Sequence, residues 1–284
     1  MVAVTTCCVA LLYAAGLTGL ALAAVLILGG LSVAAVGFWD DVRSAPVGVR
    51  MLVHLGAAAW AVYCLGTPTI RIGGFAVDAG AASAILTVLA ITWVLNLFNF
   101  MDGIDGIAAS EAGFVLCGAA VIGLLTGQFS LGLGAGLVAG AACLGFLRWN
   151  WPPAAIFMGD IGSGYLGYVI AVIAIDSAAT SALKIYVWLI LGGVFLVDAT
   201  LTLGRRLLRR ERIYQAHRTH AYQILARRCG SHSSVTIGVI VIDLVWLLPC
   251  AALAAIFPAS AWWICLLALA PLTVGGLLIG AGSD

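Results

Sequence analysis

Five aspartates in three separate stretches of the chain have the chemistry to bind a metal ion together with a phosphate. Asp40 and Asp41 follow one long apolar run, Asp102 and Asp105 follow another, and Asp160 precedes a third. Neighbouring carboxylates raise one another's pKa unless a cation or a basic group compensates their charge. Hard oxygen ligands at this density favour Mg²⁺ bound with a phosphate substrate. The aspartates therefore predict a magnesium and phosphate site, provided that the fold brings the three stretches together.

The stretch around Asp102 is the most specific motif in the chain. Asn96, Asn99 and Asp102 are spaced three residues apart, so they share one face of a helix. Gly103 and Gly106 then interrupt that helix and let the backbone approach a ligand closely. Amides and carboxylates on such a broken helix end can orient a metal, a phosphate or a nucleobase.

The stretch from residue 148 to residue 167 places Asp160 just before a helix that we expect to restart at Ser163. The free N–H groups and the positive dipole end of that helix favour an anion such as a diphosphate. Asp160 is then close enough to hold the bridging cation. The competing interpretation is that the glycines here serve only the packing of membrane helices.

A fourth stretch, residues 204–233, is dense in arginine and contains the run from His217 to Gln223. Alone, it could be an anchor on the cytoplasmic side or a contact to anionic lipids. The spacing of His217 and His220 also allows metal binding, but the absence of a nearby cysteine makes zinc a weak interpretation. Opposite a carboxylate and magnesium site, the loop better suits the negative charge of a diphosphate. We expect Asp198, which precedes the loop, to pair with the arginines at 205 and 206.

The elements that position these motifs must lie in a membrane. The chain has 284 residues, of which 63% are hydrophobic and 9% are charged, whereas a soluble domain has about 25% charged residues. A soluble globular enzyme is excluded. We expect a single all-α domain over residues 1–284, an integral membrane bundle of about ten transmembrane helices of about 20 residues each. The apolar runs are 3–20, 21–39, 51–66, 82–99, 108–127, 130–147, 161–176, 184–204, 234–256 and 261–281.

Basic residues predict the orientation, because they concentrate in cytoplasmic loops. If the loop after residue 39 is inside, eleven arginines lie inside and only Arg71 and Lys184 lie outside. Both termini and the aspartate motifs are then cytoplasmic. Each aspartate could merely end a helix at the interface, an interpretation that is reasonable for one pair but poor for three separate loops.

Four motifs together resemble the polyprenyl-phosphate N-acetylhexosamine-1-phosphate transferases of glycosyltransferase family 4, in order, spacing and side of the membrane. They are Asp40-Asp41, the run from Asn96 to Gly106, the run from Phe157 to Ser163 and the run from His217 to Gln223. The resemblance implies a bacterial inner-membrane enzyme that transfers a sugar 1-phosphate from a UDP-amino sugar to undecaprenyl phosphate and releases UMP. It also implies dependence on Mg²⁺, with Mn²⁺ as an alternative.

The resemblance also implies roles for individual residues. Asp102 and Asp160 lie at the metal, while Asp40 and Asp41 face the lipid phosphate, with Asp40 as the candidate base; a covalent aspartyl-phosphate route stays open. The loop carrying His217, Arg218 and His220 belongs to the catalytic set and has the form of the polysaccharide-initiating branch. The positions implied for substrate and uridine binding are Asn96, Asn99, Gly103, Ile104, Asp105, Asn150 and Phe157.

Two other classes compete with this interpretation. An ion-coupled secondary transporter also carries intramembrane acids and broken helices, but its acids should lie near the middle of the membrane. A CDP-alcohol phosphotransferase requires an arginine that the run after Asp105 lacks. Besides its two substrates, the expected partners are membrane lipids and not nucleic acid, and a homodimer stays open.

The resemblance also predicts an N-terminal span and a basic, glycine-rich cytoplasmic loop before the run that ends at Asp40. The sequence has neither, so we expect Met1 to be an internal methionine of a longer reading frame. On this expectation the 284-residue form is poorly active, because the missing loop could contact the substrate phosphates.

Overall fold

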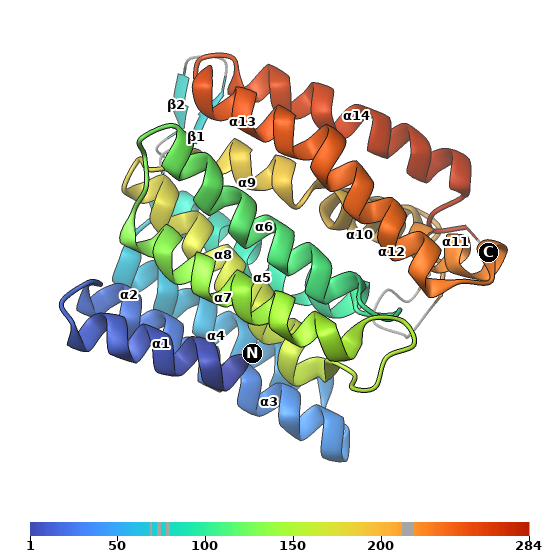
Figure 1. Ribbon diagram of the computed structural model, residues 1–284, viewed down its shortest axis with the longest axis horizontal. Helices are drawn as coiled ribbons and strands as arrows, with labels where there is room; N and C mark the ends of the chain where they lie inside the picture. Colours follow the sequence, from blue (N-terminus) through green and yellow to red (C-terminus); the bar gives the residue numbers. More distant parts are fainter. Residues whose placement is uncertain (69, 73–74, 78–79, 212–217, 284) are drawn as a thin grey trace.

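The computed structural model describes residues 1–68, 70–72, 75–77, 80–211 and 218–283, and it shows a bundle of helices that run alongside one another (Figure 1). A backbone surrounded by lipid must satisfy its hydrogen bonds internally, which explains why apolar runs of this length form helices. The helices are α1 (Val2–Ala14), α2 (Leu20–Ala24), η1 (Val25–Gly29), α3 (Gly30–Arg43), α4 (Val47–Leu65), α5 (Ala81–Met101), α6 (Ile107–Leu125), α7 (Leu131–Asn150), α8 (Gly159–Ala179), α9 (Ile185–Leu191), α10 (Gly193–Leu208), α11 (Ala221–Cys229), α12 (His232–Ile242), η2 (Asp243–Leu247), α13 (Leu248–Ile256) and α14 (Ala261–Ile279).

The prediction of a polytopic helical membrane protein is confirmed. In the described residues, 8 helical segments are long and apolar enough to cross a membrane, and the number rises to 9 if α9 and α10, which meet at a bend of 79°, form one broken span. The expected run 3–20 contains only the 13-residue helix α1, which is shorter than the roughly 20 residues that a full crossing needs. The expected number of about ten full spans is therefore too high by one or two within this part of the chain.

A short antiparallel hairpin interrupts the all-helical pattern. Strands β1 (Ile70–Ile72) and β2 (Phe75–Val77) pair with Ile70 opposite Val77, between α4 and α5. The hairpin lies at the end of the bundle far from the end of α3 (Figure 1).

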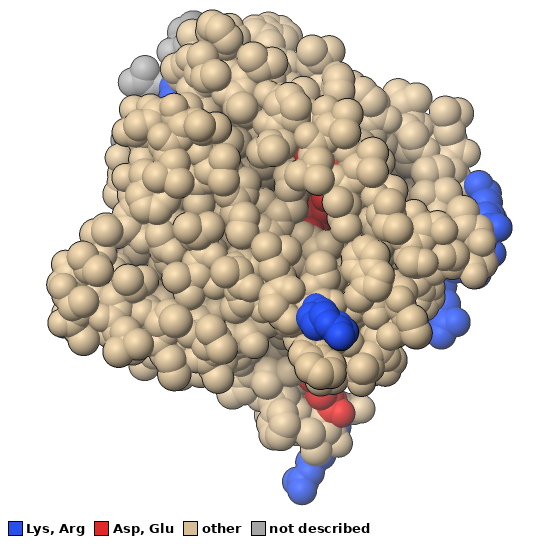
Figure 2. Space-filling model, viewed as in Figure 1, with Lys and Arg blue, Asp and Glu red and all other residues tan. Residues whose placement is uncertain are grey.

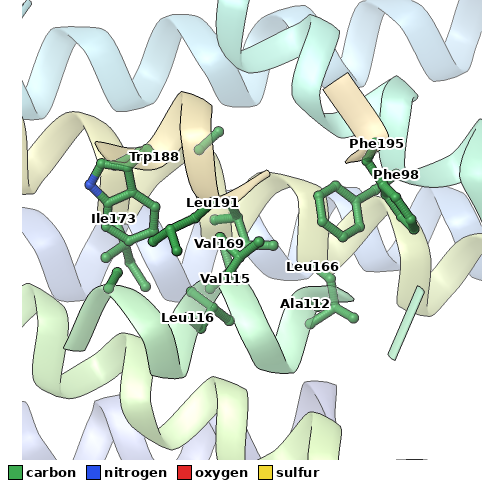
Figure 3. Close-up of a cluster of buried hydrophobic side chains, with 14 of the residues drawn as sticks. Phe98, Ala112, Val115, Leu116, Leu166, Val169, Ile173, Trp188, Leu191 and Phe195 are labelled. Atoms are coloured by element: carbon green, nitrogen blue, oxygen red, sulfur yellow. The ribbon is translucent and has the colours of Figure 1, made fainter. Parts of the chain in front are cut away.

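Helix α8 is the centre of the bundle and sets the positions of its neighbours. In the most apolar 18-residue segment of α8, 83% of the residues are buried within the bundle, the largest share among the candidate spans. In the corresponding segment of α14 the share is 17%. Figure 3 shows its side chains Leu166, Val169 and Ile173 among apolar side chains of neighbouring helices. The low burial of α14 is expected for a helix that faces lipid.

Two glycines let α3 and α5 contact the backbone of α8. A Cβ atom on Gly37 of α3 would lie 2.5 Å from the carbonyl oxygen of Asp160, and one on Gly167 of α8 would lie 2.8 Å from the Cα of Leu95 on α5. Any larger residue would force these helices apart. The two crossings bring the ends of α3 and α5 to the start of α8.

Two acidic side chains are fully enclosed within the bundle. Glu111 on α6 and Asp243, the first residue of η2, are each 0% exposed. Their carboxyl groups face each other within hydrogen-bonding range. Apart from the backbone N–H of Phe195, which lies within hydrogen-bonding range of Glu111, no N–H or O–H group of the described residues serves their four oxygens. The pair needs a proton between its two carboxyl groups, because two adjacent carboxylates without a countercharge are too costly in an apolar interior.

Candidate active site

The structure brings the three aspartate stretches together at one end of the bundle. The Asp41 carboxylate, at the end of α3, accepts hydrogen bonds from the backbone N–H groups of Asp160 (2.9 Å) and Ile161 (3.1 Å). Asp41 therefore caps the first turn of α8, which has free N–H groups like every helix start. The sequence predicted that this helix start binds an anion such as a diphosphate. In this structure the Asp41 carboxylate occupies that position.

Arg50, in the first turn of α4, joins two of the motifs. Its guanidinium forms ion pairs with the carboxylates of Asp40 and Asp160, the second at 3.0 Å. The sequence interpretation counted Arg50 only as a marker of orientation and missed it as a site residue. The available signal was its place in the short segment that directly follows Asp40 and Asp41.

Asp102 ends α5 and faces the same cluster. Burial, followed by the charges of Asp160 and Asp41, raises the pKa of its carboxyl group to about 7. No arginine or lysine among the described residues pairs with it. Asp102 is thus a carboxyl group without a countercharge, beside two other carboxylates.

The two asparagines of the motif lie on α5 beside this cluster. The amide of Asn99 donates to the hydroxyl of Ser163 at 3.3 Å, and that of Asn96 donates to the carbonyl of Thr92 at 2.7 Å. Asn99 also lies within hydrogen-bonding range of the Asp160 carboxylate. Asn96 and Asn99 thus lie on the face of α5 that lines a cavity beside this cluster, whereas Asp102 is the non-helical residue that directly follows α5.

These carboxylates suit a magnesium ion that also binds its substrate. In the described part of the chain, no three acidic, histidine or cysteine side chains converge on one point. A magnesium site does not need such a cage, because Mg²⁺ is often held by one or two carboxylates and completed by water and substrate phosphates. Asp102 and Asp160 supply that donor set, and a divalent cation would supply the countercharge that Asp102 lacks.

Two of the expected uridine-binding residues, Asn150 and Asp105, connect neighbouring loops near Asp102 through hydrogen bonds. Asn150 accepts a hydrogen bond from the backbone N–H of Gly106 (3.1 Å) and donates one to the carbonyl of Ile156 (2.9 Å). The Asp105 carboxylate accepts from the N–H of Ala154 at 3.1 Å. Both side chains therefore tie the loop before α8 to the turn between α5 and α6.

The other expected uridine positions differ in exposure. Ile104 is buried, whereas the Phe157 side chain is 75% exposed and available for stacking. Gly103 faces the hydroxyl of Tyr222, which a Cβ atom at this position would overlap. The Tyr222 hydroxyl donates to the carbonyl of Phe100 at 3.0 Å, which joins α11 to the end of α5.

The basic stretch is only partly described, and His217 lies outside the described residues. Arg218 is exposed, and its carbonyl accepts a hydrogen bond from Arg227 at 2.8 Å. His220 is buried, with 2% exposure, and its Nδ1 lies 3.3 Å from an Asp198 carboxylate oxygen. The structure therefore places Arg218 and His220 in different environments.

The expected pairing of Asp198 with the arginines that follow it is wrong. The Asp198 carboxylate accepts hydrogen bonds from the N–H groups of Ala221 (2.9 Å) and Tyr222 (3.0 Å), and so caps α11. Arg206 instead pairs with Glu211 at 2.8 Å. A helix start offers several N–H donors to one carboxylate, and these donors satisfy a buried aspartate that no arginine of the described residues pairs with.

An amphipathic cavity of about 420 Å³ opens beside the cluster. The end at Arg50 and Asp160 is its polar end, and most of the remaining lining is apolar. The polar lining comes from Arg50, His54, Thr92, Asn96, Asn99 and Asp160; the rest comes from Gly37, Val47, Met51, Leu55, Leu89, Trp93, Phe100, Gly164 and Leu203. The cavity can accommodate a molecule with an anionic head and an apolar tail.

Together, the fold and this site define a multi-pass membrane protein with a carboxylate and arginine cluster at one end of its helix bundle. Figure 2 shows how few charged side chains interrupt the face in view, with basic atoms gathered mainly toward its lower and right parts. The model of glycosyl transferase family 4 matches residues 23–178, more than half of the chain. The chain belongs to this family.

Named relatives are similar to large parts of the chain. A probable undecaprenyl-phosphate N-acetylglucosaminyl 1-phosphate transferase of Bacillus subtilis is 32% identical over 72% of this chain and 58% of its own length. A phospho-N-acetylmuramoyl-pentapeptide-transferase of Heliobacterium modesticaldum is 34% identical over 61% of this chain and 57% of its own length. One from Clostridium botulinum is 42% identical over 40% of this chain and 33% of its own length. The matched segments thus cover between one third and three fifths of these relatives.

Proposed function

We propose that this protein transfers an N-acetylhexosamine 1-phosphate from a UDP-sugar to undecaprenyl phosphate and releases UMP. The observation that carries the proposal is the cluster of Asp40, Arg50 and Asp160 beside Asp102, at the polar end of a cavity that continues between apolar walls. Family membership and the names of the relatives support the same chemistry. Initiation of O-antigen or exopolysaccharide synthesis is the use that we favour.

The cavity suits the acceptor substrate. A phosphate at its polar end would meet Arg50, and the first isoprene units would lie along the apolar residues Leu55, Leu89 and Trp93. Such a site combines apolar walls with a few well-placed polar groups, as ligand pockets generally do.

The reaction follows from these positions. Asp40 is the candidate base: it orients the acceptor phosphate and takes its remaining proton. An oxygen of that phosphate forms a bond to the β-phosphorus of the UDP-sugar. The bond from the β-phosphorus to the bridging oxygen breaks, and UMP leaves with the electron pair. Arg50, already paired with Asp40 and Asp160, neutralises negative charge as the two phosphates approach.

Asp102 and Asp160 would hold the metal ion, Mg²⁺ or alternatively Mn²⁺. When bound, the ion supplies positive charge to the diphosphate of the donor. Arg218, with His217, would add positive charge on the donor side, and Phe157 would stack on the uracil ring. Asp105 and Asn150 would act by holding the loops that carry these groups.

We place the protein in the bacterial cytoplasmic membrane with this site facing the cytoplasm. Arg43, Arg50 and Arg148 lie at the helix ends that surround the cluster, and Arg205 and Arg206 end α10. Lys184 precedes α9 at the opposite end. This asymmetry is typical of the positive-inside rule.

The proposed function is tested with purified protein, undecaprenyl phosphate and a panel of UDP-sugars, with UMP and lipid-linked product measured together. We expect magnesium-dependent UMP release with UDP-N-acetylglucosamine or a close analogue, and only when the lipid phosphate is present. An ion-coupled transporter would release no UMP with any donor. That outcome would reject the proposed function.

A further inference from the structure

His54 is a buried polar side chain in the amphipathic cavity to which none of the roles above applies. It lies four residues after Arg50 on α4, so both side chains project from the same helix face and both line the cavity. The rise of the helix places His54 about 6 Å deeper in the bundle than Arg50. It thus lies between the charged end of the cavity and its apolar remainder.

The surroundings of His54 determine where its proton lies. The residue is 8% exposed, and its Nδ1 has no hydrogen-bond partner among the described residues. A proton on Nδ1 would be a buried donor without an acceptor, which costs more than a lone pair without a donor. The neutral ring therefore carries its proton on Nε2.

Asn96 lies opposite His54 and lines the same cavity. Its amide nitrogen is engaged with the carbonyl of Thr92, so its oxygen is the atom that can accept from the His54 ring within hydrogen-bonding range. With its proton on Nε2, the neutral ring donates from that atom, as the protonated ring also does. In this structure the His54 ring donates to the Asn96 oxygen, so a phosphate bound here would accept that hydrogen bond in place of Asn96.

A phosphate at the polar end of the cavity would meet few positive charges and few free hydrogen-bond donors. One arginine faces the two carboxylates of Asp40 and Asp160, and a phosphate monoester adds a charge of about −1.5 to −2. Among the described residues that line the cavity, the other ionisable side chain is His54. The asparagines of α5 are the remaining strong donors there, and both already donate to protein atoms.

We propose that His54 donates a hydrogen bond from Nε2 to the acceptor phosphate, which is held between Arg50 and His54 on one face of α4. This inference rests on the proposed function, since it assigns the second phosphate contact of that site. It makes His54 a residue that recognises the phosphomonoester of an isoprenoid alcohol, as distinct from the alcohol itself.

The test compares farnesyl phosphate with farnesol as ligands of the purified full chain in detergent, by calorimetric titration. The variants are His54→Ala, His54→Gln, which keeps a side-chain N–H donor, and Met51→Ala, a matched control on the same helix and in the same cavity. We expect His54→Ala to weaken the binding of farnesyl phosphate about 10- to 100-fold and to leave farnesol binding nearly unchanged. His54→Gln should restore most of the loss, and Met51→Ala should weaken both ligands alike.

Kinetics provide the second measurement. His54→Ala should raise the KM for the polyprenyl phosphate and leave the KM for the UDP-sugar unchanged. Equal weakening of farnesyl phosphate and farnesol would overturn the inference, because it would make His54 a packing residue only. A change confined to the UDP-sugar KM would overturn it as well.

The two proposals can fail separately. If the wild-type chain releases no UMP but His54→Ala still loses farnesyl phosphate selectively, the proposed function fails and the phosphate contact stands. If UMP is released and His54→Ala binds farnesyl phosphate like the wild type, the contact fails and the proposed function stands. A variant that does not fold is recognised by its loss of farnesol binding, and His54→Gln then decides.

Discussion

At the scale of single residues, the site depends on carboxylates that have different partners. The Asp41 carboxylate accepts hydrogen bonds from backbone N–H groups, and the carboxylates of Asp40 and Asp160 both form ion pairs with Arg50. Asp102 has no cationic partner among the described residues. Burial and neighbouring negative charge raise the pKa of Asp102. A carboxyl group in that position gains most from a bound cation.

The first prediction concerns Asp102→Asn and Asp160→Asn. We expect each variant to lose at least about 100-fold in turnover, because a removed metal ligand costs charge stabilisation in the transition state. The melting temperature of Asp102→Asn should stay near that of the wild type, since no ion pair of the described residues is lost. UMP release at saturating Mg²⁺ and thermal unfolding measure both effects, and near-normal activity in either variant would contradict the metal assignment.

At the scale of elements, helix starts are stabilised by side chains from other helices. Asp41 of α3 caps α8, and Asp198 of α10 caps α11. Each cap satisfies N–H groups that the helix itself leaves free. Each also joins a site-bearing helix to its neighbour, so a cap here determines geometry as well as stability.

The second prediction separates these two effects for Asp41. Asp41→Ala should lower the free energy of unfolding by about 1 kcal/mol, as the loss of a helix cap does. Asp41→Asn keeps a carbonyl oxygen that can accept one of the two hydrogen bonds and should lose less. Thermal unfolding in detergent compares both variants with the wild type. Stabilities of both variants equal to that of the wild type would show that the cap contributes little.

The third prediction concerns the enclosed pair on α6 and η2. Glu111→Gln should keep the stability of the wild type, because the amide N–H replaces the shared proton. Glu111→Leu should cost about 1–3 kcal/mol, because the Asp243 carboxyl group then lacks a partner. The double variant with leucine at both positions should recover most of this loss, since replacing both partners by apolar groups is close to neutral.

Unfolding in detergent of the wild type, both single variants and the double variant measures this coupling. If Glu111→Gln and Glu111→Leu destabilise the protein equally, the two carboxyl groups do not share a proton.

At the scale of the whole molecule, the charged cluster lies at one end of the bundle and the hairpin of β1 and β2 lies at the other (Figure 1). Site residues lie at helix ends, as a phosphate-transfer site at a membrane surface requires. A carrier would instead place its acids near mid-membrane. The bend of 79° between α9 and α10 redirects α10 toward the cavity, which Leu203 lines.

The fourth prediction tests the orientation of the whole protein. Inverted membrane vesicles supplied with external UDP-sugar should release UMP, whereas intact right-side-out vesicles should release almost none until they are permeabilised. The reason is that a UDP-sugar does not cross the bilayer and the site faces the cytoplasm in our proposal. Equal rates in both kinds of vesicle before permeabilisation, with intact seals verified, would contradict this orientation.

The sequence by itself determined that the chain forms a multi-pass helical membrane protein and that the aspartate motifs belong together. Hydropathy is a local property, and its sum over a run of residues shows whether that run can cross a membrane. The spacing of Asn96, Asn99 and Asp102 likewise predicts one helix face whatever the rest of the fold is. Only the tertiary structure decided which partner each charge receives. Arg50 joins Asp40 to Asp160, and Asn150 turns inward to bind the turn at Gly106, because close helix crossings such as that at Gly37 bring distant segments together. Such contacts depend on packing in three dimensions, which spacing along one segment does not encode.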